Sequence, residues 1–201
     1  GATVKRFSVT SNYPKRNLDD QRLATVADMG LHLPDFRAAE RTFQLVTQVA
    51  GRAGRAETPG HVVVQTFVPD HYAIEEARKQ DYEAFYAREI RERAELSYPP
   101  FGRLVQLIIS HPEEEDAGTL ARKMGSSLEA FLLRESIADI EVLGPAPAPL
   151  AKLRGRHRFQ LLVKGCEEQL VLRAARLLIK EMSTLPKPAH ATLDVNPVNM
   201  L

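Results

Sequence analysis

The clearest pattern of apolar and polar positions lies in the second half of the chain, after Pro99-Pro100. Short apolar runs predict strands, and apolar residues every three or four positions predict helices. These patterns give, in order, a strand at 104–109, a helix at 113–133, strands at 140–143 and 158–163, a helix at 167–182 and a strand at 191–195. A proline- and alanine-rich loop at 144–149 would join the two middle strands. This βαββαβ order predicts an α+β, ferredoxin-like domain with two helices on one face of an antiparallel sheet.

The first half carries weaker signals. Residues 1–22 are polar, with a short alternation at Phe7-Ser8-Val9, which indicates a disordered arm or one poor strand. Apolar residues at helical spacing then predict a helix that Asp35 caps and Gly51 stops. A run rich in β-branched residues predicts a strand at 61–67.

A charged helical pattern follows, in which Tyr82 and Tyr86 lie four residues apart on one face. Neither proline of Pro99-Pro100 can continue a helix or donate to a strand ladder, so the break marks a domain boundary. We therefore expect a first domain at 1–69, a connecting helix at 70–97 and a C-terminal domain at 98–201.

Composition narrows the classes of protein without naming one. Lys and Arg number 27 against 26 Asp and Glu, so the formal net charge of +1 gives no overall attraction to nucleic acid, and a binding surface must be local. The single cysteine, Cys166, excludes an internal disulfide and a multi-cysteine zinc site. No apolar run is long enough to cross a membrane and no secretory signal opens the chain, so we expect a soluble cytoplasmic protein without a membrane partner.

A doubled glycine–arginine motif follows the first helix: Gln48-Val49-Ala50-Gly51-Arg52-Ala53-Gly54-Arg55. Glycine lets a backbone approach a ligand closely, and the planar guanidinium of arginine suits phosphate oxygens. An arginine placed at a γ-phosphate stabilises the charge that spreads over it during transfer. The alternative is a helix C-cap followed by two solvated arginines.

This motif resembles the last conserved motif of superfamily 2 helicases. The residues around it, Leu33 to Arg41, narrow the resemblance to the primosomal protein N′ (PriA) family of replication-restart DNA helicases. The resemblance runs from about Ala27 to Leu201 and includes Leu143-Gly144-Pro145, the basic run from Arg154 to Gln160, and Asp194-Val195-Asn196-Pro197.

The resemblance implies that residues 1–69 are the end of a second, RecA-like helicase lobe and that 98–201 form a DNA-binding domain. Gln48, Gly51, Arg52, Gly54 and Arg55 would face ATP bound in the other lobe, with Arg55 as the arginine finger and Arg52 as a second phosphate contact. In the family, ATP with Mg²⁺ drives 3′–5′ unwinding and cysteines bind zinc. This chain has no zinc ligands, phosphate-binding loop or Walker-B acidic pair, so we expect it to be inactive as an ATPase alone.

The other candidate site is a basic run, in which Lys152, Arg154, Arg156 and Arg158 crowd together ahead of Phe159. Like charges at alternate strand positions share a face and repel, which favours an anionic partner such as DNA phosphate. The alternatives are a solvated strand edge and a site for an acidic protein tail. Phe159 could stack on a base, but its alternation with Leu161 and Val163 favours an inward position.

The function that follows is the C-terminal portion of a replication-restart helicase that binds branched DNA at stalled forks. Its implied partners are fork and single-strand/duplex-junction DNA, single-strand-binding protein and other primosome proteins. The family motif expected before Ala27 is missing from residues 1–22, which favours an alternative: a non-catalytic fork-binding or scaffold protein that has lost the motor. A generic RNA-binding βαββαβ module is disfavoured, because its strands would be rich in aromatic residues.

Overall fold

The computed structural model describes residues 6–10, 22–26, 31, 35–52 and 61–200. These form two compact units, residues 1–92 and 93–201, each with its own core.

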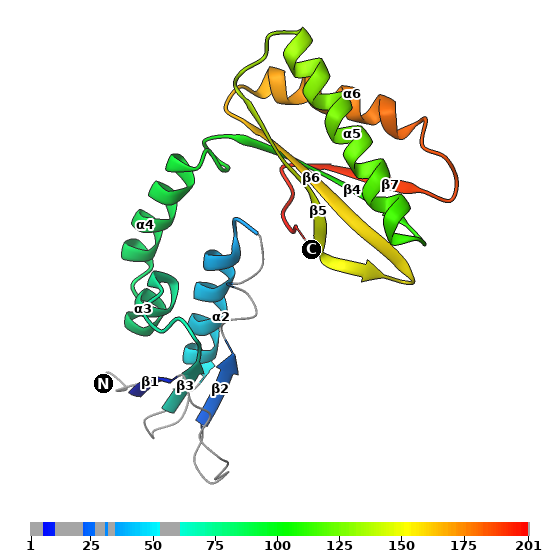
Figure 1. The fold of residues 1–201 in the computed structure, drawn as a ribbon. Coiled ribbons are helices and arrows are strands. Elements are labelled where there is room, and N and C mark those ends of the chain that lie inside the picture. The colour runs from blue at the N-terminus through cyan, green and yellow to red at the C-terminus, as the bar shows by residue number, and fades with distance from the viewer. Residues whose placement is uncertain (1–5, 11–21, 27–30, 32–34, 53–60, 201) are drawn as a thin grey trace. The chain divides into compact units, whose positions relative to one another are not determined.

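The first unit contains a parallel sheet in the order β1-β3-β2 among the described residues. Its elements are β1 (Arg6–Thr10), β2 (Arg22–Val26), α2 (Ala38–Arg52), β3 (His61–Gln65), α3 (Tyr72–Lys79) and α4 (Tyr82–Glu95), the last of which runs on into the second unit (Figure 1). The expected arm therefore contains a strand at residues 6–10, and residues 11–21 lie outside the described part. The strand β2 was not predicted.

The core of this unit lies between α2, β3 and the two helices that follow. Phe43 from α2 stacks on Phe85 from α4, with ring centroids 4.2 Å apart, and Val62 and Val64 of β3 are fully buried. Asp35 lies three residues before Ala38, the first residue of α2, rather than next to the helix as the predicted cap; its Oδ1 accepts a hydrogen bond from the Arg37 N–H at 2.9 Å in the preceding turn. The helix continues through Gly51 to Arg52, one residue beyond the predicted stop.

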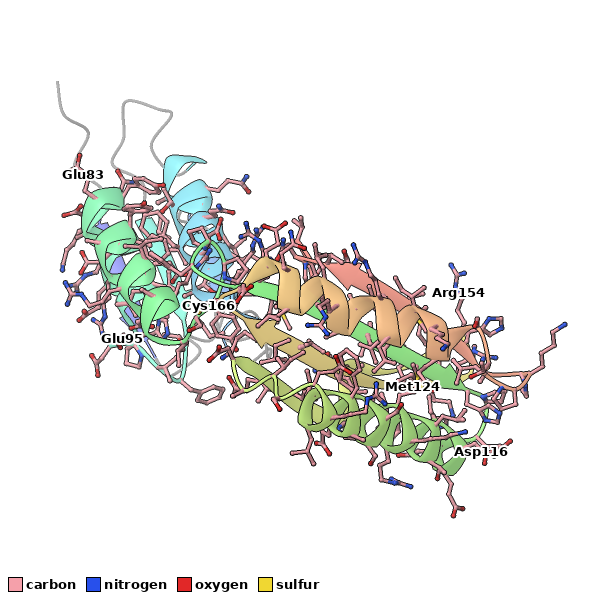
Figure 2. All side chains as sticks on the ribbon, turned by 90° about the horizontal axis from the view of Figure 1, so that it is seen from above. Glu83, Glu95, Asp116, Met124, Arg154 and Cys166 are labelled. Atoms are coloured by element: carbon pink, nitrogen blue, oxygen red, sulfur yellow. The ribbon has the colours of Figure 1, made fainter. Side chains whose placement is uncertain are left out.

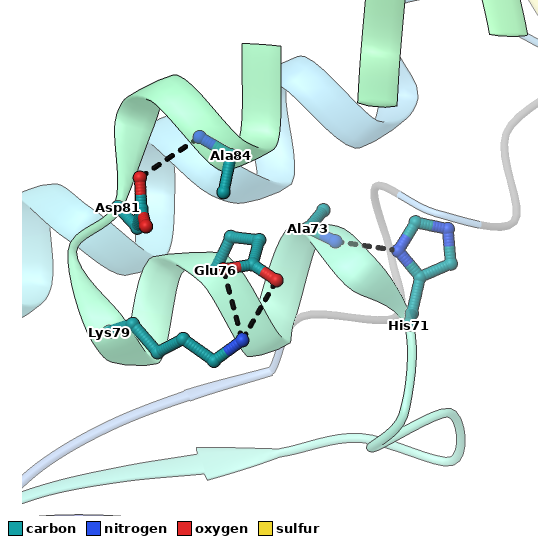
Figure 3. A network of polar contacts seen from close by, with 6 residues as sticks. All are labelled: His71, Ala73, Glu76, Lys79, Asp81 and Ala84. Atoms are coloured by element: carbon teal, nitrogen blue, oxygen red, sulfur yellow. Dashed lines mark hydrogen bonds and ion pairs between the residues drawn. The ribbon is translucent and has the colours of Figure 1, made fainter. Parts of the chain in front are cut away.

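The expected connecting helix is two helices. Gln80 ends α3 in the left-handed conformation with φ of 58°, and its N–H bonds to the carbonyls of Ala77 and Glu76. Asp81 then precedes the first residue of α4 and caps the helix: its Oδ1 accepts from the Ala84 N–H at 2.9 Å (Figure 3). The charged pattern predicted helix on both sides, but a single Gln-Asp step carries no strong break signal.

A buried polar contact ties α4 to α3. The Tyr72 hydroxyl donates to Glu89 Oε2 at 2.6 Å, and both residues are almost fully buried. The Arg88 guanidinium lies 4.6 Å from the centre of the Tyr72 ring. Burial and the neighbouring Glu89 carboxylate raise the pKa of the Tyr72 hydroxyl far above its usual range.

His71 caps α3. Its Nδ1 accepts from the Ala73 N–H at 3.2 Å (Figure 3). Burial lowers the pKa of His71 below its ordinary value of 6.5, and the positive charge of Arg88 lowers it further. The carboxylates of Glu92 and Glu89 raise this pKa but do not outweigh the effect of burial. The folded chain therefore favours the neutral imidazole.

This gives a pH dependence with a definite sign. A lowered folded-state pKa contributes stability above pH 6.5 that is lost as the pH falls through the folded-state value. We expect the free energy of unfolding to fall more steeply between pH 7.5 and 5.5 in the unaltered chain than in His71→Asn, whose side-chain oxygen keeps the cap without titrating. Urea unfolding followed by circular dichroism measures the difference; equal slopes in the two proteins would contradict it.

The second unit has the predicted βαββαβ order. Its elements are β4 (Arg103–His111), α5 (Glu114–Arg134), β5 (Ile140–Leu153), β6 (Arg156–Gly165), α6 (Glu168–Met182) and β7 (His190–Val195). The strands lie in the order β5-β6-β4-β7 with every neighbouring pair antiparallel. Both helices lie on one side of this sheet (Figure 1), and the core is between them and the inward residues of β4 and β6.

The expected loop at 144–149 belongs instead to β5, which spans fourteen residues. Its pairing with β6 shifts register between Leu143 and Ala146 and again between Pro147 and Lys152. Because β5 is an edge strand, its prolines need not donate to a neighbour on the outer side, and the irregular register accommodates them. Proline content alone therefore led to the wrong prediction of a loop.

Candidate nucleic-acid interface

The predicted basic run forms the tip of the β5–β6 hairpin. Leu153 pairs with Arg156, so Arg154 and Gly155 are the two turn residues. Their φ angles of 49° and 76° are both positive, as a type I′ turn requires. Arg154 is therefore at a turn rather than on a strand, and it projects from the end of the unit opposite Cys166 (Figure 2).

The four basic residues have different surroundings. Arg156 is held by the protein: its guanidinium donates to the carbonyl of Ser110 at 2.9 Å and to that of Pro188. Within the described residues, Arg158 makes one hydrogen bond, to the carbonyl of Leu150 at 3.2 Å. Arg154 is exposed and has no hydrogen bond or ion pair within the described part of the chain.

Lys152 does not join the three arginines. It pairs with His157, whose side chain lies on the helix side of the sheet, whereas Arg156 and Arg158 lie on the open side. The strand-spacing argument expected the arginines at 154, 156 and 158 to share one face. They do line one surface, but Arg154 reaches it from the turn.

That surface is a groove of about 250 Å³ on the open face of the sheet, at the hairpin end. We call it the hairpin groove; its lining includes Ile108, Ser110, Leu153, Arg154, Arg156, Arg158, His190 and Thr192. The arginines supply charge, while Ile108 and Leu153 supply apolar surface. Such a mixture suits a ligand that has both phosphate and a flat apolar part.

The acidic residues at this end of the unit lie on the other side of the sheet. Glu114, Glu115 and Asp116 open α5 on the helix side, where their charges interact favourably with the positive end of the helix dipole. The Asp116 carboxylate lies 3.4 Å from His111 Nδ1, and that of Glu114 lies 3.4 Å from His157 Nδ1. The carboxylates of α5 thus lie beside these histidines and leave the charge of the hairpin groove positive.

Phe159 points inward, as its alternation predicted. It packs against the core, and its ring lies close to Gly118 of α5. Phe159 is therefore not available for stacking on a base at the open face.

The sequence analysis predicted only the arginines of the groove and missed its other members, including the polar residues Ser110, His190 and Thr192. Ser110 pairs across the sheet with both Arg158 and His190, and Thr192 lies next along β7. The strand register brings these residues together, and no short motif marks them. The alternation along 104–110 could have indicated which of its residues face away from the helices.

The helicase-like motif is only partly described. Gln48 and Gly51 are exposed on α2, and Gln48 lies one helical turn before Arg52, so the two share a face of the helix. Gly54 and Arg55 lie outside the described residues. The ATP-facing roles of this set stay predictions.

Among the described residues, no group of three or more histidine, cysteine or carboxylate side chains could hold a metal ion, and none of the helices is long and apolar enough to span a membrane. Cys166 is a free, exposed thiol.

Comparison with known proteins gives one consistent result. A family model described as the primosomal protein N C-terminal domain matches residues 94–198. Relatives named replication restart protein PriA are 40% identical over 177 residues in Bacillus subtilis, 39% over 175 in Treponema pallidum and 38% over 178 in Synechocystis. Each alignment covers 87% of this chain but only 22%, 26% and 20% of those relatives, respectively. Since the family model covers most of the second unit and about half of the chain, the chain belongs to the primosomal protein N (PriA) family, of which it represents the C-terminal part.

Proposed function

We propose that this chain is the C-terminal part of a replication-restart DNA helicase and that its second unit binds branched DNA at stalled forks. The names of the relatives support the replication-restart part of the proposal. The DNA-binding part is supported by one observation above all: three arginines line the hairpin groove, while the neighbouring carboxylates of α5 lie on the opposite side of the sheet.

The three arginines of the hairpin groove have different roles. Arg154 and Arg158 are the phosphate ligands, because one has no partner in the described part of the chain and the other keeps donors free beyond its bond to Leu150. Arg156 is a positioning residue that fixes β6 to Ser110 and Pro188. Lys152 contributes long-range attraction from the other face.

The first unit would supply half of an ATP site in the intact protein. Gln48, Arg52 and Arg55 would face ATP and Mg²⁺ held by another lobe of a RecA-like motor, with Arg55 stabilising the charge that develops on the γ-phosphate. The intact protein would act in the cytoplasm. Its partners would be DNA junctions, single-strand-binding protein and other primosome proteins.

Arg154→Gln is expected to weaken binding to a three-way fork by about fivefold to tenfold at 0.1 M salt, since one phosphate contact and its counterion release are lost. Fold stability should not change, because Arg154 is exposed at a turn tip. Fluorescence anisotropy with labelled fork, single strand and duplex measures the effect.

Arg176→Gln is the matched control, because it removes the same charge from an exposed position on α6. If the two variants weaken binding equally, only net charge matters and the hairpin groove is not the DNA site. If neither binds less tightly than the unaltered chain, the arginines serve another partner.

A further inference from the structure

The open face of the second sheet is covered over one half of its length. Along β4, the residues on this face go from fully buried Leu104 and 3% exposed Gln106 to half-buried Ile108 and Ser110. Since the helices lie on the other face, another part of the chain must provide the cover.

The cover is the segment after β7, residues 196–200. Asn196 turns the chain with φ of 52° and locks to β4: its N–H donates to the Leu104 carbonyl at 2.6 Å, and its Oδ1 accepts from the Leu104 N–H at 3.1 Å. Met200 is 2% exposed, and its carbonyl accepts from the Gln106 side chain at 3.1 Å. The Gln106 amide also donates to Gln160 at 3.0 Å.

The strand register shows where the cover ends. Gln160 of β6 pairs with Ile108, which pairs on its other side with Thr192. Gln160 is buried, whereas Ile108 and Thr192 line the hairpin groove. One row further out, Arg158, Ser110 and His190 all line it. The hairpin groove is thus the uncovered part of the open face of this sheet, and it extends over two rows of cross-strand neighbours.

We propose that the hairpin groove takes one unpaired nucleotide, with segment 196–200 as the wall that limits it to one. This rests on the proposed DNA binding and narrows it to a substrate class. The volume of about 250 Å³ lies below the roughly 300–1,000 Å³ of drug-sized pockets, which leaves room for one base but not for a run of bases. The apolar side chains of Ile108 and Leu153 suit contact with the flat face of a base, and the planar guanidinium groups of arginine can stack on bases.

Double-stranded DNA can contact only the edge of the hairpin groove, where Arg154 lies. In a duplex the bases are stacked inside and only phosphates can approach Arg154, whereas an unpaired nucleotide can also place its base over Ile108. A branched fork offers such nucleotides at its junction, so unpaired character rather than sequence is what the groove selects.

The test uses labelled duplexes that end in 0, 1, 3 or 6 unpaired nucleotides, with either strand protruding. In anisotropy titrations of the whole chain, the first unpaired nucleotide should tighten binding at least about fivefold, the lower end of what one stacked base contributes. Further nucleotides should add little. In Arg154→Gln every duplex should bind more weakly, because all of them can place a phosphate at Arg154.

The outcomes separate the two proposals. If no DNA binds above the non-specific level, the proposed function fails. If all the duplexes bind with equal, Arg154-dependent affinity, the groove binds phosphate but the single-nucleotide inference is wrong. Affinity that rises steadily to six nucleotides would also overturn it, because the strand would then cross the face that residues 196–200 cover.

Met200→Ala tests the role of the wall. We expect the second and third unpaired nucleotides to tighten binding in this variant, as Gln106 and Gln160 become accessible. Hydrogen exchange at the Leu104 amide, which should be faster, reports whether the segment has loosened. If the segment loosens but the dependence of DNA affinity on the number of unpaired nucleotides stays the same, the proposed role of residues 196–200 is wrong.

Discussion

Replacing Arg52 and Arg55 together by alanine in a full-length version of the protein is expected to lower DNA-stimulated ATP turnover by about a thousandfold. Arginine fingers contribute about 10³–10⁵ in kcat because a planar cation stabilises the charge on the transferring γ-phosphate. Gln48 and Arg52 lie four residues apart in α2, a spacing that places two positions on one face of a helix. Steady-state phosphate release with saturating single-stranded DNA measures the effect.

The controls separate a catalytic role from damage to the fold. Arg176→Gln, on α6, should turn over ATP at the unaltered rate, and lysine at position 55 should restore little, since a point charge cannot replace the fork of arginine. DNA affinity of the double variant should stay within about twofold of the unaltered protein, because the hairpin groove is unchanged. Full turnover without Arg52 and Arg55 would instead favour a protein in which this motif has no motor function.

Gly102→Ala is expected to destabilise the second unit by about 2–3 kcal/mol, toward the upper end of the usual cost of overpacking. A Cβ at this position would lie 2.1 Å from the carbonyl oxygen of Ser97 and 3.2 Å from that of Gly165. Both are backbone atoms, so relief requires the entry to β4 to move. Urea unfolding followed by circular dichroism measures the change.

Gly51→Ala provides the comparison, because nothing lies within 4 Å of a Cβ there and alanine favours helix. It should leave the stability unchanged or raise it slightly. If Gly102→Ala unfolds at the same urea concentration as the unaltered chain, the close approach of Ser97 to Gly102 is not a constraint on the fold.

The element order of the second unit could be predicted because its strands and helices carry clear apolar patterns. The strands β4 and β6 contain short apolar runs whose core residues lie at alternate positions, and the apolar positions of α5 recur every three or four residues. The exception is β5, whose prolines at 145, 147 and 149 read as a loop although an edge strand tolerates them. Whether a strand lies at the edge depends on the order of strands in the whole sheet, which the local sequence of that strand does not show.

The first unit was harder to predict for a related reason. The strands β1 and β2 are five residues long and both pair in parallel with β3. Parallel pairing joins segments that are distant in sequence, so their short polar patterns carry little of the information. At Gln80, a left-handed cap divides what the sequence presented as one helix.

The candidate site was predictable as chemistry but not as geometry. The run from Lys152 to Arg158 marked an anion site. Only the structure shows that Arg154 has no partner among the described residues, that Arg156 is held by Ser110, and that Lys152 lies on the opposite face. The cover over Gln106 comes from a segment 94 residues away in sequence. Such long-range contacts are set by tertiary packing.

The salt dependence of fork binding tests the central claim most directly. Each phosphate neutralised on duplex DNA adds about 0.9 to the slope of log affinity against log salt concentration. If the hairpin groove binds DNA, the slope should fall by about 1 in Arg154→Gln and stay unchanged in Arg176→Gln. An unaltered slope in Arg154→Gln would mean that the arginine touches no phosphate, and the DNA-binding role of the hairpin groove would be wrong.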